Sequence, residues 1–319
     1  DIKNEWQGYI PYKNILTYKN PKEGYVSSAN QHPVNKTYPY YYYSHNYEMY
    51  RGRRLIERLE SIENVEINDI KKIQNDNFNY KAYEVLPLIL DEIDTSKLTY
   101  EQKIYFKNLK NWDYFAEVSN ENQVVFNEWW NNLYKNIWDE FDSLKYPYRK
   151  PNSFRTYKLI KEDKNSKFYD VISTSKNESL NDLINKSFLE ITVKLDTFKK
   201  RNSLKKIKWD HYKNTTINHL LRIKSFSYDS VSIGGYRNIL NAASERHGPS
   251  FRLIVKLKQN EKTKAWGVYP GGQSGNIGSQ NYFGEVENWG KGVYNKLLFN
   301  SNYMDNRNHI IFEKKYNIK

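Results

Sequence analysis

The sequence predicts an α+β protein in which a large helical lobe separates two regions of strands and turns. Three observations carry this prediction. Residues 60 to about 225 repeat large apolar side chains at helical spacing, the first 50 residues are broken by prolines, and residues after 226 alternate as strands between glycine-rich turns. We therefore expect one structural unit made of three parts, residues 1–60, 61–225 and 226–319.

The N-terminal part is expected to form turns and short core strands. Four prolines punctuate it between residues 11 and 39. Within it, residues 24–30 read as a short apolar strand that runs into a polar tip at Asn30 and stops at Pro33. The side-chain amide of Asn30 would then lie at the end of a rigid element, where it either donates a hydrogen bond to a ligand or only closes a turn.

The middle part is predicted to be helical, beginning with a basic helix over residues 51–59. Asn68 or Asp69 is a predicted helix cap, and Thr99 with Gln102 three residues later fits a capping box. Three stripes of apolar side chains at helical spacing are interpreted as buried faces rather than cofactor boxes, because any buried helix face shows this spacing. The stripes are Tyr105, Leu109 and Trp112; Phe126, Trp129, Trp130, Leu133, Ile137 and Phe141; and Leu180, Leu183, Ile184, Phe188, Ile191 and Leu195.

The remaining segments are predicted to be connections and strands. Residues 142–176, rich in Pro, Asn, Lys and Ser, are expected to form a connection between two of these helices. Residues 251–257 and 264–269, separated by a polar turn, predict an antiparallel hairpin. A glycine-rich loop follows the hairpin, and a last short strand is expected at 309–312.

Composition bounds the class of protein. Lys and Arg number 50 against 37 Asp and Glu, so the net charge is +13, and the chain contains 29 tyrosines. A basic, aromatic-rich chain fits a module that binds nucleic acid or polysaccharide by stacking, but the lysines are scattered and no nucleic-acid-binding motif accompanies them. The charge is interpreted as a compositional habit of a low-GC genome, because net charge speaks to solubility rather than to fold.

Several classes of site are excluded or weak. The chain has no Cys, which excludes disulfides and thiolate nucleophiles. The six histidines show no metal-ligand spacing, so no metal site is predicted, and no apolar run is long enough to span a bilayer. The loop with Gln273 and Ser274 resembles half of a nucleophile elbow or a phosphate loop, but it lacks the helix, triad or lysine that either would need. No self-sufficient catalytic set is visible.

Ordered motifs along nearly the whole chain carry a resemblance to a known family. They are WQGYIP at 6–11, GYVSSANQHP at 24–33, YRGRR at 50–54, QND at 74–76, LPL at 86–88, the segment 209–221, IGG at 233–235, HGPSFR at 247–252 and PGGQSGNIG at 270–278. Together they resemble the C-terminal part of the β-subunit in the penicillin acylase family of N-terminal-nucleophile hydrolases, in its Bacteroidetes-like version. The resemblance implies an αββα sandwich, with the helical lobe beside it.

The resemblance also implies a reaction. In this family a precursor cuts itself and exposes a serine as the first residue of the β-subunit, and this serine attacks an amide carbonyl with its own α-amino group as base. An α-amine has an ordinary pKa near about 7.7–8, which suits a general base at neutral pH. Because residue 1 is Asp, we expect the nucleophile and much of the acyl pocket upstream, so that this fragment of a longer β-subunit is inactive alone.

Six residues receive roles from the resemblance. Asn30 matches the asparagine whose amide stabilises the oxyanion, and Arg51 matches the arginine that orients the nucleophile region, although neighbouring arginines leave its register open. Gln31 and His32 flank the site. The loop containing Gln273 and Ser274 is expected near the substrate mouth, with packing as its main role.

The resemblance sets expectations for cofactors, partners and location. No cofactor is required; a structural calcium ion occurs in the family, but the stretch after Pro39 has no Asp to bind it. The expected partners are the rest of the β-subunit, the α-subunit of the same precursor and a small N-acyl substrate, with no nucleic acid. Family members are exported, so a periplasmic or secreted protein is expected, although this chain has no signal peptide. The alternatives are a scaffold without a nucleophile and the binding module considered above.

Overall fold

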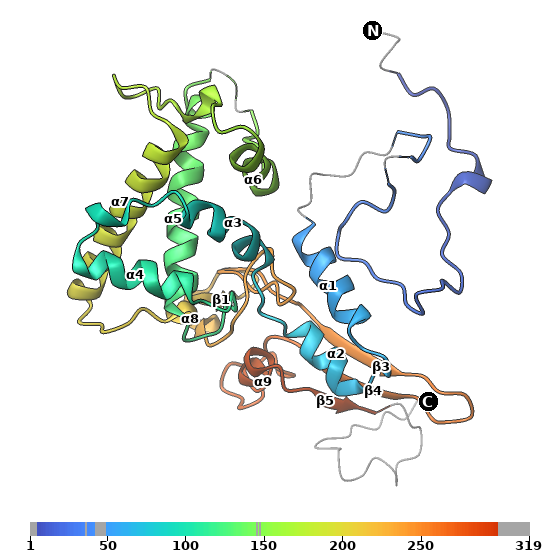
Figure 1. Cartoon of the computed structure of the whole chain (residues 1–319). Coiled ribbons are helices and arrows are strands. Elements are labelled where there is room, and N and C mark those ends of the chain that lie inside the picture. The colour runs from blue at the N-terminus through green and yellow to red at the C-terminus, as the bar shows by residue number, and fades with distance from the viewer. Residues whose placement is uncertain (1–4, 36, 42–48, 145, 147, 299–319) are drawn as a thin grey trace.

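The computed structural model describes residues 5–35, 37–41, 49–144, 146 and 148–298. A helical lobe lies on one side of the molecule, a smaller lobe with strands lies beneath it, and the N-terminal segment runs along the outside of helix α1 (Figure 1). The helices are α1 (Tyr50–Glu60), α2 (Ile67–Gln74), α3 (Tyr80–Leu90), α4 (Tyr100–Lys110), α5 (Glu121–Ile137), α6 (Ser153–Glu162), α7 (Leu180–Arg201), α8 (Trp209–Lys213) and α9 (Val286–Lys291). The strands are β1 (Thr215–Ile217), β2 (Tyr228–Val231), β3 (Arg252–Lys256), β4 (Lys264–Val268) and β5 (Asn295–Leu297).

The predicted helix starts are partly confirmed. The Thr99–Gln102 capping box opens α4, with both reciprocal hydrogen bonds present. The predicted cap at Asn68 or Asp69 is wrong, because α2 is capped by Glu66 and Asp69 is the residue that reaches back to it. The basic helix predicted at 51–59 is α1.

The helical lobe is built on the predicted apolar stripes. Helix α5 packs against α7, where the Trp129 ring lies 4.9 Å from that of Phe188 and both side chains are buried. Burying a side chain of this size contributes roughly 1.5–3 kcal/mol. The second stripe was predicted one turn too long, because α5 ends at Ile137 and Phe141 lies in a separate 3₁₀ turn, Asp139–Asp142.

The connection predicted at 142–176 was also wrong in part, because it contains α6. The Asn152 side chain accepts a hydrogen bond from the backbone N–H of Arg155 and caps this helix. Thr156 and Ile160 are buried on its inner face. Tyr157 and Leu159 are partly buried against the same core. Few of the residues in this segment are fully buried, so its polar composition concealed its helical pattern.

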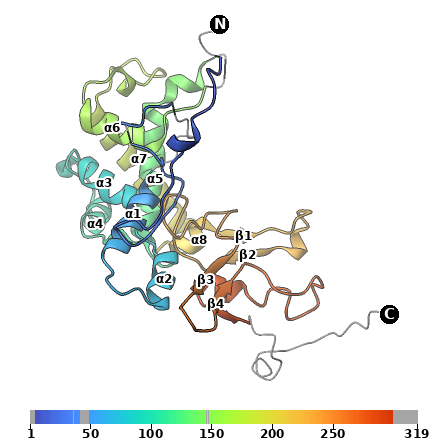
Figure 2. The ribbon, with the colours of Figure 1, turned by 90° about the vertical axis from the view of Figure 1, so that its right-hand side faces the viewer.

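Two small antiparallel sheets form the other lobe. The predicted hairpin is confirmed as β3 and β4, with Ile254 opposite Trp266, and β5 pairs with β4 on the far side. Strands β1 and β2 form a separate hairpin that projects from the body of the molecule (Figure 2). Since the described strands form two separate sheets, the αββα sandwich stays a prediction, as do the boundaries of the three parts.

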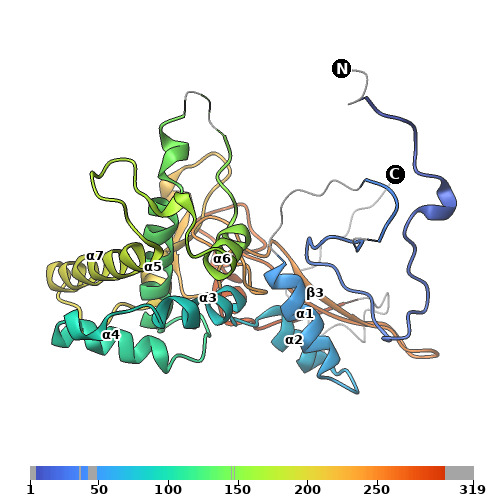
Figure 3. The ribbon, with the colours of Figure 1, turned by 45° about the horizontal axis from the view of Figure 1, so that its top comes forward.

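The strand predicted at 24–30 is wrong. These residues form turns and irregular backbone, Val26 is 67% exposed, and Asn30 has a positive φ of 64°, outside the β region. A strand is stable only when it pairs with a neighbour, and no described residue forms a ladder with this segment. Figure 3 shows the segment beside α1, away from the helical lobe. The strand predicted at 309–312 lies outside the described residues.

No helix in the described ranges is both long enough and apolar enough to cross a bilayer.

Candidate active site

Asn30 and Arg51 meet where the N-terminal segment crosses the first turn of α1. An Nη2 N–H of Arg51 donates to Oδ1 of Asn30 at 2.6 Å. This contact occupies the amide oxygen and directs the amide nitrogen away from the guanidinium. Among the described residues the Asn30 Nδ2 group has no hydrogen-bond acceptor, and both Asn30 and the neighbouring His32 are exposed. A charged donor on the oxygen polarises the amide, so its N–H groups become better donors.

Gln31 fixes the turn that carries Asn30. Its amide closes on the local backbone, because Nε2 donates to the Ser27 carbonyl at 3.2 Å and Oε1 accepts from the Ala29 N–H at 2.5 Å. The same side chain packs against Gly52 of α1, where an added Cβ would lie 3.2 Å from it. The lack of a side chain at Gly52 therefore lets the turn approach the helix and brings Asn30 to Arg51.

The loop with Gln273 and Ser274 makes contacts mainly within itself and with the adjacent strand. The Ser274 N–H donates to the Asn281 carbonyl at 3.3 Å, and the Ser274 Oγ accepts from the Asn276 N–H at 3.1 Å. Burial raises the pKa of Tyr269, and its hydrogen bond with the Gln273 side chain acts in the opposite direction. The packing role expected for this loop stays a prediction.

The structure therefore brings together only some of the predicted site residues. Asn30, Gln31 and Arg51 form one cluster with His32 beside it, whereas the loop of Gln273 and Ser274 lies between β4 and α9. No hydrogen bond or ion pair joins the two groups within the described part of the chain, and the N-terminal segment and α9 lie apart in Figure 1.

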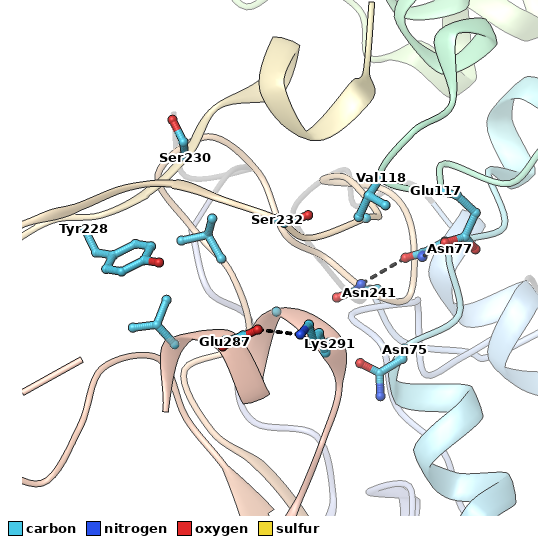
Figure 4. Close-up of a pocket in the computed structure, with 14 residues that line it drawn as sticks. Asn75, Asn77, Glu117, Val118, Tyr228, Ser230, Ser232, Asn241, Glu287 and Lys291 are labelled. Atoms are coloured by element: carbon cyan, nitrogen blue, oxygen red, sulfur yellow. Dashed lines mark hydrogen bonds and ion pairs between the residues drawn. The ribbon is translucent and has the colours of Figure 1, made fainter. Parts of the chain in front are cut away.

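A second feature, which the sequence did not predict, is a hollow of about 650 Å³ between the two lobes. Figure 4 shows polar side chains on one wall and Tyr228 on the other, with Glu287 paired to Lys291 at the rim. The polar wall includes Asn77, Glu117 and Asn241.

A hydrogen-bonded relay leads from the sheet to this hollow. Arg252 of β3 donates to Oδ1 of Asn241 at 2.7 Å, Asn241 donates to Oδ1 of Asn77 at 2.9 Å, and Asn77 donates to Glu117 at 3.0 Å. Burial lowers the pKa of Arg252, and Tyr294 opposes this effect. The relay links the buried Arg252 cation to the exposed Glu117 carboxylate through two amides, and these hydrogen bonds fix the orientation of both amide groups. The only signal for these asparagines in the sequence is their closeness to the QND and IGG motifs.

The described residues do not fit a calcium ion. Part of the stretch after Pro39 lies outside the described residues, and the described Tyr40 and Tyr41 carry no carboxylate. Elsewhere in the described ranges, no three His, Cys, Asp or Glu side chains gather as metal ligands.

Comparison with known proteins identifies the fold around this cluster. The family model described as penicillin amidase matches residues 1–306. Among solved structures, the chain is similar to a thermostable penicillin G acylase from Alcaligenes faecalis, with 12% sequence identity and a TM-score of 0.60. The match covers 99% of this chain and 60% of the other, so this chain spans about three fifths of the length of that acylase. At this identity the structural match establishes similarity of fold alone.

Proposed function

The chain belongs to the penicillin amidase family, and from this premise we propose that it is the C-terminal part of the β-subunit of an amidohydrolase that cleaves an N-acyl amide. The observation that carries the proposal is the Asn30–Arg51 pair. The Arg51 guanidinium donates to the Asn30 amide oxygen at 2.6 Å, and no residue that the structure describes accepts from the Asn30 amide nitrogen, which lies on an exposed edge.

This geometry suits an oxyanion donor. When an amide carbonyl is attacked, negative charge develops on its oxygen, and a donor already in position stabilises that charge without reorganising. Asn30 would supply one such N–H, and Arg51 would hold and polarise its amide. Gln31 and Gly52 would keep the turn in place.

We propose that the nucleophile is a serine at the N-terminus of the β-subunit, on sequence outside this chain. Its α-amino group would accept the hydroxyl proton as the serine oxygen bonds to the carbonyl carbon. The amine would then leave with a proton, and water would hydrolyse the acyl-enzyme. The chain alone would lack the nucleophile, so we expect it to be inactive.

Exposed apolar side chains on the segment that carries Asn30 support a partner there. Trp6, Tyr9 and Val26 are exposed along the N-terminal segment. Exposed apolar side chains of this size are typical of a surface that packs against another segment. We propose that the rest of the β-subunit and the α-subunit cover it, and that the assembled enzyme is exported to the periplasm or secreted.

The substrate class is a small N-acylated amine. N-acyl-homoserine lactones, β-lactam side-chain amides and related amides are the compounds to test, because most of the acyl pocket would lie outside this chain.

The test is amine release from a panel of these amides by the complete processed enzyme and by residues 1–319 alone. We expect hydrolysis by the complete enzyme, loss of hydrolysis when its N-terminal serine is changed to alanine, and none from the chain alone. Absence of hydrolysis across the panel by the complete enzyme, or full activity of the isolated chain, would contradict the proposal.

A further inference from the structure

Lys213, the last residue of α8, is buried in a cage of backbone carbonyls. Four carbonyl oxygens lie within hydrogen-bond distance of its side-chain Nζ, those of Ile233 at 2.9 Å, Gly234 at 2.9 Å, Gly235 at 3.2 Å and Ala243 at 3.0 Å. Because an ammonium group has three N–H donors, one N–H is shared between two of these oxygens. Only 4% of the residue is exposed. Four oxygens from a segment 20 to 30 residues away therefore converge on one nitrogen.

No carboxylate pairs directly with this nitrogen. Within the described chain Lys213 forms no salt bridge. Asp210 accepts instead from the hydroxyl of Ser232 at 2.7 Å, and Glu245 accepts from Tyr236 at 2.8 Å. The carbonyl dipoles, with the face of the Trp209 ring 5.7 Å from the nitrogen, are thus the groups that replace water around the charge.

The cage favours the charged form of the side chain. Burial lowers the pKa of Lys213 to about 7, and the negative charges of Glu245 and Asp210 oppose this effect. Each carbonyl that accepts an N–H also favours the ammonium form. A neutral amine would offer fewer donors and would turn its lone pair toward an oxygen.

The caged segment needs a cation because its backbone cannot satisfy these oxygens in a regular ladder. Gly235 has a φ of +72°, and an added Cβ there would lie 2.0 Å from the Asn241 carbonyl oxygen. A Cβ on Gly234 would lie 2.4 Å from Asn77 Nδ2. The turn is therefore tight. Without the Lys213 donor, the carbonyls of Ile233, Gly234 and Ala243 would be buried and unpaired among the described residues, whereas the Gly235 carbonyl would still accept from the indole N–H of Trp209 at 2.9 Å.

We propose that these four carbonyls form a site for a primary ammonium ion, and that Lys213 fills it as a tethered cation. By filling the site, Lys213 holds the segment that contributes Gly234 and Asn241 to the hollow between the lobes. Lys213 is thus a positioning residue for the hollow, and an untethered alkylammonium ion should replace its side chain. This inference does not rest on the proposed hydrolase activity.

The experiment is chemical rescue followed by hydrogen–deuterium exchange of the full chain. Lys213→Ala removes three methylenes and the ammonium group, which n-propylammonium restores in shape and charge. The variant is examined at about pH 6, where a primary alkylamine is protonated. The additives are n-propylammonium, propanol as an uncharged mimic, and tetramethylammonium as a cation without N–H donors.

We expect peptides covering 233–243 to lose protection in Lys213→Ala, and n-propylammonium alone to restore it in a dose-dependent manner. Equal rescue by propanol would show that only volume matters and would overturn the proposal, as would the absence of any rescue.

Lys213→Met, which keeps the stem without the charge, covers the case in which the alanine variant does not fold. Its segment 233–243 should exchange at least tenfold faster than in the wild type, and wild-type protection in this variant would also overturn the proposal. Lys208→Met, at the exposed start of the same helix, is the matched control and should leave the exchange unchanged.

Discussion

Removing the Asp76 carboxylate should be among the most destabilising single changes in this chain. Arg54 donates to Asp76 through Nε at 3.1 Å and through Nη2 at 2.8 Å, and both residues are 8% exposed. Oδ1 of Asp76 also accepts from the Phe78 N–H at 2.9 Å. Asp76→Ala leaves a buried guanidinium without its main partner, which typically costs about 3–5 kcal/mol. We expect about 4 kcal/mol, because Glu57 still contacts Arg54 at 3.1 Å.

The assay is urea unfolding followed by far-ultraviolet circular dichroism, in which the midpoint should fall by more than about 1 M. Glu57→Ala is the matched control: its side chain is 53% exposed, and such pairs contribute about 0–1 kcal/mol. The double variant Arg54→Met/Asp76→Ala should be less destabilised than the sum of the two single variants. If Asp76→Ala costs no more than Glu57→Ala, the account of this buried pair is refuted.

Three further predictions concern backbone, pH and the predicted site. Gly235→Ala should lower the free energy of unfolding by more than about 2 kcal/mol in the same urea assay, because the φ of +72° and the Asn241 carbonyl oxygen exclude a Cβ. Gly275 has open space around it, so the control Gly275→Ala should change this free energy by less than about 0.5 kcal/mol. Asp182→Ala should cost about 0.5–1 kcal/mol at neutral pH, because hydrogen bonds from Ser179 lower the pKa of Asp182 to about 2. That stabilisation exists above the ordinary pKa of 3.8 and is lost as the pH falls through about 2, so the melting temperatures of the wild type and Asp182→Ala should become equal near pH 2. A difference in melting temperature that persists at this pH would contradict the capping role. Gly52→Val should displace Gln31 and lower kcat of the complete enzyme about tenfold or more with little loss of stability, and an unchanged kcat would separate this contact from the site.

Features decided by neighbouring residues could be predicted from the sequence. The Thr99–Gln102 capping box, the stripe from Leu180 to Leu195 and the β3–β4 hairpin each depend on spacing within one segment, and the structure contains all three. The cap of α2 was misplaced because Glu66 is a less common cap than the Asn and Asp that follow it.

Features decided by distant residues could not be predicted. The segment 24–30 has the composition of a strand, but whether it pairs depends on an edge supplied from elsewhere. The cage around Lys213 joins residues 20 to 30 positions apart, and the bond between Asn77 and Asn241 spans 164 positions. Such polar residues look like turn or surface residues in the sequence, and only the fold reveals their burial.

The candidate site was predicted from motifs rather than from physical pattern. The sequence pattern indicated only that Asn30 ends an apolar segment. The family resemblance assigned Asn30 the role of oxyanion donor and Arg51 the role of orienting the nucleophile region. These two side chains are hydrogen-bonded to each other, and the roles assigned to them stay predictions. The expected closeness of Gln273 and Ser274 to the same site stays a prediction.

The proposed hydrolysis depends most on Asn30 as the donor that stabilises negative charge in the transition state. The direct measurement is the rate of acyl-enzyme formation by the complete processed enzyme. This rate is determined from the pre-steady-state burst with an N-acyl chromogenic substrate. It is compared between the wild type, Asn30→Ala and the control Asn35→Ala. Asn35 is exposed, and its side-chain oxygen accepts from the backbone N–H and the hydroxyl of the nearby Thr37. We predict a 10²–10³-fold loss for Asn30→Ala with an unchanged fold, the typical cost of removing one oxyanion donor, and no loss for Asn35→Ala. An acylation rate within about threefold of wild type in Asn30→Ala would contradict the central claim.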